Sequence, residues 1–379
     1  MRLDAEPRMI SQRPVEILGA GPAGLSAALT AARAGRPVTL YERRSEVGSR
    51  FHGDLQGLEN WTTPVDVLEE LGAIGIQPTF DCAPISEGVF YDAAGRERVV
   101  RSGRPAFYLV RRGSADGTLD QSLKAQALSA GVSIRFREAP ADFPNGVIRT
   151  PGPGRCDALD VGYVFDTEMA DGVFAALSER LAPKGYAYLL ISRGWGTVAV
   201  CLFDDYANAR EYRERARDFF ERRVGLTMRN PRAFGGTGNV LATPLTHCGN
   251  ALYAGEAAGL QDALWGFGMR YALLSGHLAA SAFVARTPRQ YERSFRRRFA
   301  GFLRASVVNR FFYERLGDSG YARLLERIAR AADAREWLRR FYAPRLWKTL
   351  WFPIARASVE SARRRAEAGA RAPALPATR

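Results

Sequence analysis

Three glycines at a fixed spacing near the N-terminus constrain most strongly what this chain can fold into. Residues 15–18 read VEIL, GAGPAG follows at 19–24, an alanine-rich segment runs to Gly35, and PVTLYE ends at Glu42. The order predicts a strand, a tight turn, a helix and a second strand. In that setting the Gly19-x-Gly21-x-x-Gly24 motif is typical of dinucleotide-binding α/β folds, because glycine lets backbone N–H groups approach a diphosphate.

The second strand ends on an acid that suits the same ligand. The Glu42 carboxylate can accept hydrogen bonds from both ribose hydroxyls and would repel a 2′-phosphate. The helix that begins after Gly21 turns its positive dipole end toward the anion. These residues fit NAD and FAD equally well.

A second glycine cluster stands far down the chain, where residues 253–271 read YAGEAAGLQDALWGFGMRY. Glycine is unfavourable inside regular elements, so such a cluster marks tight turns or close approach of the backbone to another group. The segment follows an apolar strand and runs into a helical pattern.

The first segment, GAGPAGLSAALTAARAGRPVTLYERR, resembles the fingerprint of FAD-dependent oxidoreductases of the para-hydroxybenzoate hydroxylase type. The second, AGEAAG followed by GFGMRYALLSGHLAA, is most similar to the geranylgeranyl reductase family, which reduces isoprenoid double bonds with a flavin. The resemblance implies FAD as cofactor. It also implies that Gly255 and Glu256 meet the ribityl chain and that Gly266 and Gly268 open a helix aimed at the flavin ring.

Cofactor-binding residues follow from the two segments and from basic residues that relatives place near the diphosphate. They are Gly19, Gly21, Pro22, Ala23, Gly24, Glu42, Arg43, Arg50, Arg111, Gly255, Glu256, Gly266, Gly268 and Met269. Arg112 is the alternative to Arg111, and a surface arginine is the alternative to both.

The chain departs from the family at several places. Position 256 is Glu where the family has Asp, and the region near 150, TPGPGRCDALDVGYVF, lacks the Asp-Gly pair that contacts flavin and nicotinamide phosphates in many relatives. The electron donor is therefore open between NAD(P)H and a reduced ferredoxin-like protein.

The loop after Glu42 lacks the cysteine that often stands there in the reductase family. His52 and Asp54 are the catalytic candidates in its place, with His52 as proton donor and Asp54 tuning its ring. The alternative is a histidine in a surface loop. We expect no metal site, since the four cysteines are far apart in sequence.

Two apolar runs at 185–191 and 197–203 flank SRGWG and predict a hairpin. In the resembled family such a sheet covers the flavin and lines a lipid tunnel. We therefore expect Tyr186, Tyr188 and Trp265 to line a substrate cavity. One of the two tyrosines could instead be ordinary core.

The sequence predicts an α/β fold: a Rossmann-like FAD-binding domain, a β-sheet substrate domain and a helical C-terminus. The expected FAD-binding domain is discontinuous and comprises residues 1–80, 105–155 and 245–285. The sheet domain comprises 81–104 and 156–244, the C-terminal helices comprise 286–361, and we expect a disordered tail at 362–379.

The net charge of +14, almost all of it from arginine, suits nucleic acid, an anionic membrane surface or acidic ligands, or it reflects a solvated surface. No nucleic-acid motif appears, so we expect no such partner. The segment WLRRFYAPRLWKTLWFPIAR at 337–356 mixes aromatic and basic residues and suits peripheral membrane contact, with packing against the protein itself as the alternative. No signal peptide or spanning run is visible, which predicts a cytoplasmic protein.

The most direct functional prediction is reduction of a carbon–carbon double bond in an isoprenoid or lipid-like substrate by hydride from reduced flavin. A flavin monooxygenase or halogenase is one alternative, although the GxWxWxIP strand of the halogenases is absent. A flavin-bearing electron-transfer protein without its own substrate is the other.

Overall fold

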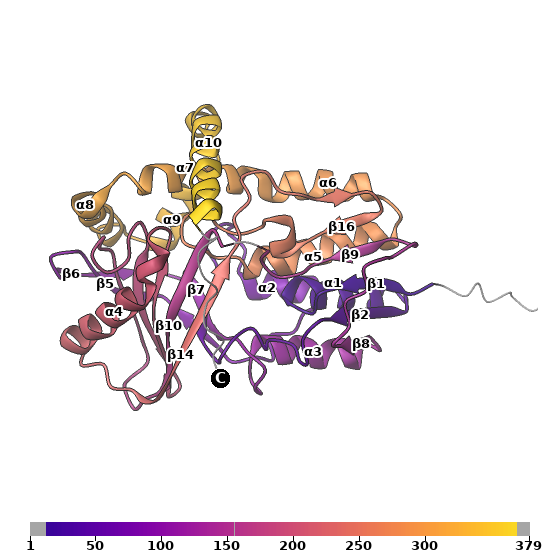
Figure 1. The fold of residues 1–379 in the computed structure, drawn as a ribbon, viewed down its shortest axis with the longest axis horizontal. Helices are drawn as coiled ribbons and strands as arrows, with labels where there is room; N and C mark the ends of the chain where they lie inside the picture. Colours follow the sequence, from indigo (N-terminus) through magenta and orange to yellow (C-terminus); the bar gives the residue numbers. More distant parts are fainter. Residues whose placement is uncertain (1–12, 155, 370–379) are drawn as a thin grey trace, which may run out of the picture.

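The computed structural model describes residues 13–154 and 156–369. Within these ranges the chain forms a six-stranded sheet, a seven-stranded sheet and a three-stranded sheet, and helices follow at its C-terminal end. Figure 1 shows the six-stranded sheet at one end of the molecule and the seven-stranded sheet at the other, with the C-terminal helices along one side.

The six-stranded sheet has the order β15-β16-β9-β1-β2-β8, and its strands pair in parallel except for β15 with β16. Helices α1, α3 and α5 pack around it. The bounds are β1 Val15–Leu18, β2 Val38–Glu42, β8 Ser133–Phe136, β9 Val147–Arg149, β15 His247–Cys248, β16 Ala251–Tyr253, α1 Pro22–Arg33, α3 Leu119–Ser129 and α5 Met269–Val284. The strand, helix and strand predicted between residues 15 and 42 are therefore confirmed.

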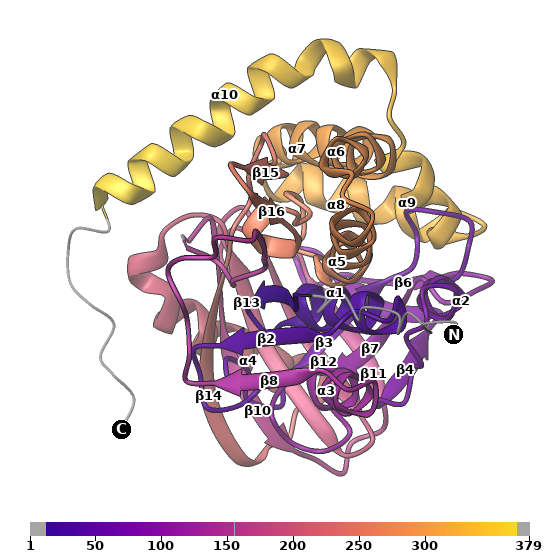
Figure 2. The ribbon, with the colours of Figure 1, turned by 90° about the vertical axis from the view of Figure 1, so that its right-hand side faces the viewer.

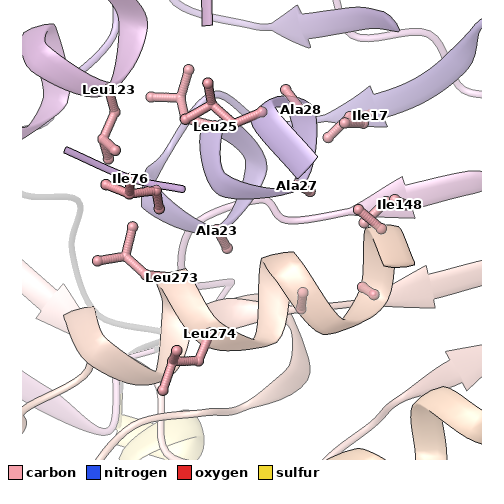
Figure 3. Close-up of a cluster of buried hydrophobic side chains, with 14 of the residues drawn as sticks. Ile17, Ala23, Leu25, Ala27, Ala28, Ile76, Leu123, Ile148, Leu273 and Leu274 are labelled. Atoms are coloured by element: carbon pink, nitrogen blue, oxygen red, sulfur yellow. The ribbon is translucent and has the colours of Figure 1, made fainter. Parts of the chain in front are cut away.

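Helix α1 occupies the centre of the core. It begins after Gly21 with Pro22 at its first position, where the missing N–H of proline costs nothing, and it ends just before Gly35, whose φ is +73°. Its alanines and leucines are buried on nearly every side. In Figure 3, Leu25 points toward Leu123 and Ile76, while Ala23 points toward α5 beside Leu273.

The seven-stranded sheet, of order β14-β10-β13-β12-β11-β5-β6, is antiparallel except for β11 with β5. The predicted hairpin is confirmed: β12 and β13 are joined by Arg193 and Gly194, both at positive φ, as a tight right-twisting turn requires. Helix α4 packs on one face. The bounds are β5 Glu87–Tyr91, β6 Glu97–Arg101, β10 Ala158–Asp166, β11 Gly172–Ala176, β12 Tyr186–Ser192, β13 Trp195–Leu202, β14 Arg229–Gly238, η1 Tyr206–Asn208 and α4 Ala209–Val224.

A smaller sheet has the order β3-β7-β4, and its strand β3 contacts α5, β12 and β13. The bounds are β3 Leu55–Glu59, β4 Cys82–Ile85, β7 Phe107–Arg111, α2 Val67–Ala73 and η2 Gly255–Ala258. Both larger sheets contain strands from distant parts of the sequence. The exact domain boundaries remain a prediction.

The C-terminal part is helical, as predicted. The elements are α6 Pro288–Phe295, the π-helical turn η3 Arg296–Ala300, α7 Gly301–Tyr313, α8 Gly317–Ala329, α9 Ala334–Tyr342 and α10 Leu346–Gly369. Helix α10 continues through 362–369, where the sequence predicted a disordered tail; residues 370–379 lie outside the described ranges. Within those ranges no helix is both long and apolar enough to cross a bilayer. Figure 2 shows α10 passing over α7 and then projecting beyond the other helices.

Candidate functional site

Both glycine-rich segments face one cavity of about 670 Å³. Residues 18–23 and 265–269 line it from the side of the six-stranded sheet, although about 240 positions separate them in the sequence. Residues 158, 160, 186, 188 and 234–238 line it from the seven-stranded sheet. A pocket of this size, between two sheet systems, is a default location for a cofactor or substrate.

The first glycines combine close packing with open space. A Cβ on Gly24 would lie 1.8 Å from the Gly19 carbonyl oxygen, and a Cβ on Gly19 would lie 2.7 Å from that of Thr150. These two residues must therefore be glycine for the turn to close. A Cβ on Gly21, by contrast, would meet no described heavy atom within 4 Å, so the turn keeps free space on its cavity side.

Two helices begin at the cavity without a capping side chain in the described structure. Helix α1 starts after Gly21 and helix α5 starts after Gly268, and neither N-cap residue makes a side-chain hydrogen bond to the first turn. The first N–H groups of each helix lack intrahelical partners and form a partial positive charge. The arrangement suits negatively charged ligand groups at the N-termini of both helices.

The α1 and α5 helices are held together by residues without side-chain bulk. A Cβ on Gly276 of α5 would lie 2.1 Å from the Ala23 carbonyl oxygen, and a Cβ on Gly255 would lie 2.7 Å from the Ala23 Cβ. Gly255 has φ of +63°, which a side chain rarely adopts. Gly24 and Gly255 therefore shape the site from behind and are not part of the cavity lining, in contrast to the other predicted glycines.

Glu42 lines the cavity at the end of β2. Its carboxylate accepts hydrogen bonds from the backbone N–H groups of Ala20, at 2.9 Å, and Arg44, at 2.8 Å. These contacts fix the acid beside the glycine turn, and each carboxylate oxygen keeps lone pairs for a further donor.

Glu256, the position where the family carries Asp, also lines the cavity. Its longer side chain accepts from Arg50 Nη1 at 3.0 Å and from the Asn239 N–H at 3.1 Å. Arg50 also donates to the Thr237 carbonyl. The carboxylate therefore links the loop after β2 to the residue that follows β14. The extra methylene of Glu256, relative to Asp, lengthens the side chain that makes these two contacts.

The basic residues predicted at the diphosphate divide into two groups. Arg43 and Arg50 line the cavity, whereas Arg111 does not. Arg111, the last residue of β7, pairs with Asp81 at 3.3 Å and lies over the Trp195 ring, outside the cavity. The next residue, Arg112, lines the cavity instead, because adjacent residues of an extended chain point to opposite sides.

The catalytic candidates His52 and Asp54 both line the cavity, but they do not form the predicted pair. The Asp54 carboxylate accepts from the backbone N–H of His52 at 2.9 Å and from Gln56 Nε2 at 2.6 Å. The His52 ring is exposed and lies near Phe234. Asp54 therefore shapes the loop and does not contact the imidazole.

The predicted substrate-lining residues all face the cavity. Tyr186 and Tyr188 are two residues apart on β12, so they share one face of the sheet. The Tyr186 hydroxyl donates to the Trp265 carbonyl at 2.6 Å, which ties the sheet to the loop that carries Gly266. The far end of the cavity is apolar and is lined by Trp61, Phe90, Val100, Phe107, Leu177, Leu325, Ile328, Ala334 and Leu338.

Two polar residues of the lining, Gln261 and Asp160, were missed by the sequence analysis, and a third, Arg112, was named only as the alternative to Arg111. Gln261 donates to the Gly266 carbonyl at 2.9 Å, while its Oε1 is buried without a hydrogen-bond partner among the described residues. Arg112 forms a buried bidentate pair with Asp120, with both contacts at 2.9 Å. Asp160 stands on β10 among apolar neighbours. The single signal for Asp160 was an acid within a mostly apolar strand.

Comparisons with known proteins agree with this outline. A family profile described as "NAD(P)-binding Rossmann-like domain" matches residues 17–68. The digeranylgeranylglycerophospholipid reductase of Methanocaldococcus jannaschii is 22% identical over 380 residues, which cover 84% of this chain and 91% of that protein. The reductase of the same name from Methanoculleus marisnigri is 25% identical over 321 residues, covering 70% of this chain and 74% of that protein.

Solved structures show the same fold. A geranylgeranyl bacteriochlorophyll reductase-like protein from Thermoplasma acidophilum superimposes with a TM-score of 0.69 at 18% identity, over 92% of this chain and 98% of that one. A flavin-dependent brominase superimposes with a TM-score of 0.61 at 15% identity, over 93% and 99%. The predicted α/β architecture is confirmed, and so is the resemblance drawn from the two glycine segments.

Proposed function

We propose that this chain, which resembles the geranylgeranyl reductase-like flavoproteins in sequence and in fold, uses FAD to reduce a carbon–carbon double bond of an isoprenoid or similar lipid. The observation that supports this most is the shape of the cavity. One end is built from the glycine turn, Glu42 and the α1 N-terminus, and the other end is apolar and aromatic. A dinucleotide cofactor and a hydrophobic chain can thus meet in one cavity.

The described residues fit FAD. Gly21 leaves open space beside the α1 N-terminus for a diphosphate, and Glu42 stands one strand away for the ribose. Gly266 and Gly268 keep the cavity side of the α5 N-terminus free of side chains, as a flat ring requires. Near Gly266, the buried Oε1 of Gln261 has no hydrogen-bond partner among the described residues and can accept a hydrogen bond from an N–H of the ligand.

FAD, when bound and reduced, supplies the hydride. The residues of the chain contribute binding, orientation and exclusion of water. The α5 N-terminus favours negative charge on the ligand edge that faces Gly268 and Met269. The aromatic and aliphatic walls hold an alkene chain by apolar burial alone, because they offer few polar partners.

The test uses the purified full chain loaded with FAD under anaerobic conditions. The flavin is reduced with dithionite or with NADPH, and a lipid carrying geranylgeranyl chains is added. We expect substrate-dependent reoxidation of the flavin and a mass gain of two hydrogens for each double bond. Reoxidation without that gain would contradict the proposal, and so would a product that acquires an oxygen or halogen atom in a parallel reaction with air and halide. In the absence of dithionite, reduction of the flavin by NADPH but not by buffer alone would identify the nicotinamide as a competent electron donor.

We further propose that helix α10 rests on a lipid surface. Nine large apolar side chains are exposed in the described structure, and five of them lie within 346–354: Leu346, Trp347, Leu350, Trp351 and Ile354. Their spacing places them on one side of α10, while Phe352, Ala355 and Val359 pack on the other side in a cluster with residues of α7. Trp347 and Trp351 stand at the edge of the stripe, where their rings also contact Phe312 of α7. The exposed Arg345 and Arg356 flank the stripe, as expected for a helix lying at anionic headgroups.

Sedimentation with vesicles tests this second proposal. We expect the protein to bind vesicles rich in phosphatidylglycerol and to lose that binding in a Leu346→Glu, Leu350→Glu variant, since these are the two most exposed side chains of the stripe. The matched control is Leu128→Glu, which adds a charge at an exposed leucine of α3, away from α10. Equal binding of both variants would refute the assignment of α10.

A further inference from the structure

The seven-stranded sheet presents an acid to the cavity that the proposed chemistry has not yet used. Asp160 on β10 pairs with Cys201 on β13, which in turn pairs with Tyr186 on β12. Paired residues of neighbouring strands share one face of a sheet, and all three line the cavity. Asp160 therefore belongs to the wall that the substrate would touch, and it sits in the row next to Tyr188.

The two oxygens of Asp160 differ in their surroundings. Oδ2 accepts a hydrogen bond from the Tyr188 hydroxyl at 2.7 Å. Oδ1 is closed off from solvent and has no hydrogen-bond partner among the described residues. A charged carboxylate in that position would leave one oxygen without solvation, whereas a protonated carboxyl avoids most of that cost.

The neighbouring groups favour the neutral form. Burial raises the pKa of Asp160 to about 7, the Tyr188 hydroxyl lowers the pKa, and the charge on Asp54 raises it. Burial and the nearby Asp160 hold the pKa of Tyr188 well above its ordinary value, so Tyr188 remains a donor. The other titratable groups that face Asp160 are Tyr186 and Cys201, and burial raises the pKa of each, so both stay neutral.

We propose that Asp160 is the proton donor of the reaction and that Tyr188 is the positioning residue that holds its carboxyl against the cavity wall. This inference rests on the proposed reduction of a double bond. As one alkene carbon receives the hydride, the Asp160 O–H bond breaks and a C–H bond forms on the adjacent carbon. The substrate gains two hydrogens, and the carboxylate regains its proton through the Tyr188 hydroxyl, which is hydrogen-bonded to Oδ2, lines the cavity and takes a proton from solvent in turn. The reducing equivalents come from NAD(P)H or, in the test, from dithionite.

A structural role for Asp160, limited to anchoring Tyr188, is the competing explanation. The variant Asp160→Asn separates the two, because the amide oxygen can still accept from Tyr188 while the side chain loses its acidic proton. Asp166→Asn is the matched control: Asp166 ends the same strand and is not part of the cavity lining.

The first experiment follows reoxidation of dithionite-reduced flavin by the prenyl substrate between pH 5 and 9. For the wild type we expect the rate to fall as pH rises through about 7, as the donor loses its proton. For Asp160→Asn we expect a rate at least about 100-fold lower and independent of pH, within the usual range for loss of a general acid. The FAD dissociation constant should change less than about threefold, a change too small to explain the loss of rate. Asp166→Asn should behave as the wild type.

Tyr188→Phe gives a second, directional outcome. Because the Tyr188 hydroxyl lowers the pKa of Asp160, its removal should move the inflection of the pH profile to higher pH. An Asp160→Asn enzyme with the wild-type rate and profile would overturn the donor role while leaving the proposed reduction intact.

The last measurement does not depend on turnover. Infrared difference spectra of the FAD-loaded protein, titrated from pH 5 to 9, should show a protonated carboxyl C=O band that disappears near pH 7 and is missing in Asp160→Asn. If the wild-type protein reduced no prenyl lipid, both the proposed reduction and the donor role of Asp160 in it would be refuted. The infrared band would still decide whether Asp160 holds a proton. A band lost already below pH 5 would overturn the inference by itself.

Discussion

Ala23 and Gly276 meet where helices α1 and α5 cross, and the space between them admits no side chain: a Cβ on Gly276 would lie 2.1 Å from the Ala23 carbonyl oxygen. This contact fixes the two helix starts that face the cavity relative to one another. Figure 3 shows the surrounding cluster, in which Ala23 points toward α5.

The first prediction concerns that crossing. Gly276→Ala should lower the free energy of unfolding by about 1–3 kcal/mol or more, because overpacking outweighs the roughly 1 kcal/mol that alanine gains in helix propensity. Urea denaturation measures the change. The control is Ser281→Ala, an exposed position of the same helix, which should stay within about 0.5 kcal/mol of the wild type. Equal stability of Gly276→Ala and wild type would show that the helices can move apart freely.

The second prediction separates folding from cofactor binding within one motif. Gly21→Ala should leave the stability of the FAD-free protein within about 0.5 kcal/mol of the wild type, since its Cβ meets open space. It should still weaken FAD binding at least tenfold, or about 1.4 kcal/mol, because the Cβ stands where the diphosphate would approach. Gly24→Ala should destabilise the protein even without FAD, since its Cβ would lie 1.8 Å from the Gly19 carbonyl oxygen.

Fluorescence titration with FAD and thermal unfolding of the FAD-free protein measure these two effects. If Gly21→Ala bound FAD as tightly as the wild type, the diphosphate would have to lie elsewhere in the cavity.

The third prediction compares a buried ion pair with an exposed one. Arg112 and Asp120 are 5% and 1% exposed, and Asp120→Asn leaves the guanidinium without its charge partner, so it should cost about 3–5 kcal/mol. Glu87→Gln breaks the exposed pair with Arg101 and should cost less than about 1 kcal/mol. Urea denaturation midpoints at constant m-value test the contrast, and similar losses for the two variants would contradict it.

The fourth prediction is a pH dependence of stability in the FAD-free protein. The folded-state pKa of Asp160, about 7, lies above the ordinary value near 3.9. Between these values the folded protein holds a proton that the unfolded chain has released, so this group makes stability fall as pH rises, by up to about 1.4 kcal/mol per pH unit. Below about pH 4 the contribution is fully present, and above 7 it is lost.

Asp160→Asn lacks this titration, so its stability relative to the wild type should increase between pH 5 and 7. Thermal unfolding of both proteins at each pH measures the difference. A difference that stays constant across this range would mean that Asp160 titrates in the folded protein as it does in the unfolded chain.

Local rules made much of the fold predictable. The elements between residues 15 and 42 follow from glycine geometry and from short-range periodicity, and both act within a few residues. The start of α5 at Met269 was predictable for the same reason. The meeting of the two glycine segments at one cavity came from a resemblance, since nothing local joins positions so far apart.

The remaining site residues depended on long-range geometry. Whether Arg111 or Arg112 faces the cavity is decided by where β7 ends, and a shift of one residue reverses the answer. His52 and Asp54 looked like a pair because they are close in sequence, but Asp54 binds the main chain of the loop. Asp160 acquires its meaning only through Tyr188, Cys201 and Tyr186, which arrive from two other strands.

Helices α8 and α9 supply Leu325, Ile328 and Leu338 to the apolar end of the cavity, and they lie outside both glycine segments. The extent of the apolar end is thus set by side chains that do not belong to the two glycine-rich segments. If the proposed function holds, trimming or enlarging a single aliphatic residue there would alter how long a lipid chain fits, while the residues around Gly21 and Glu42 would stay unchanged.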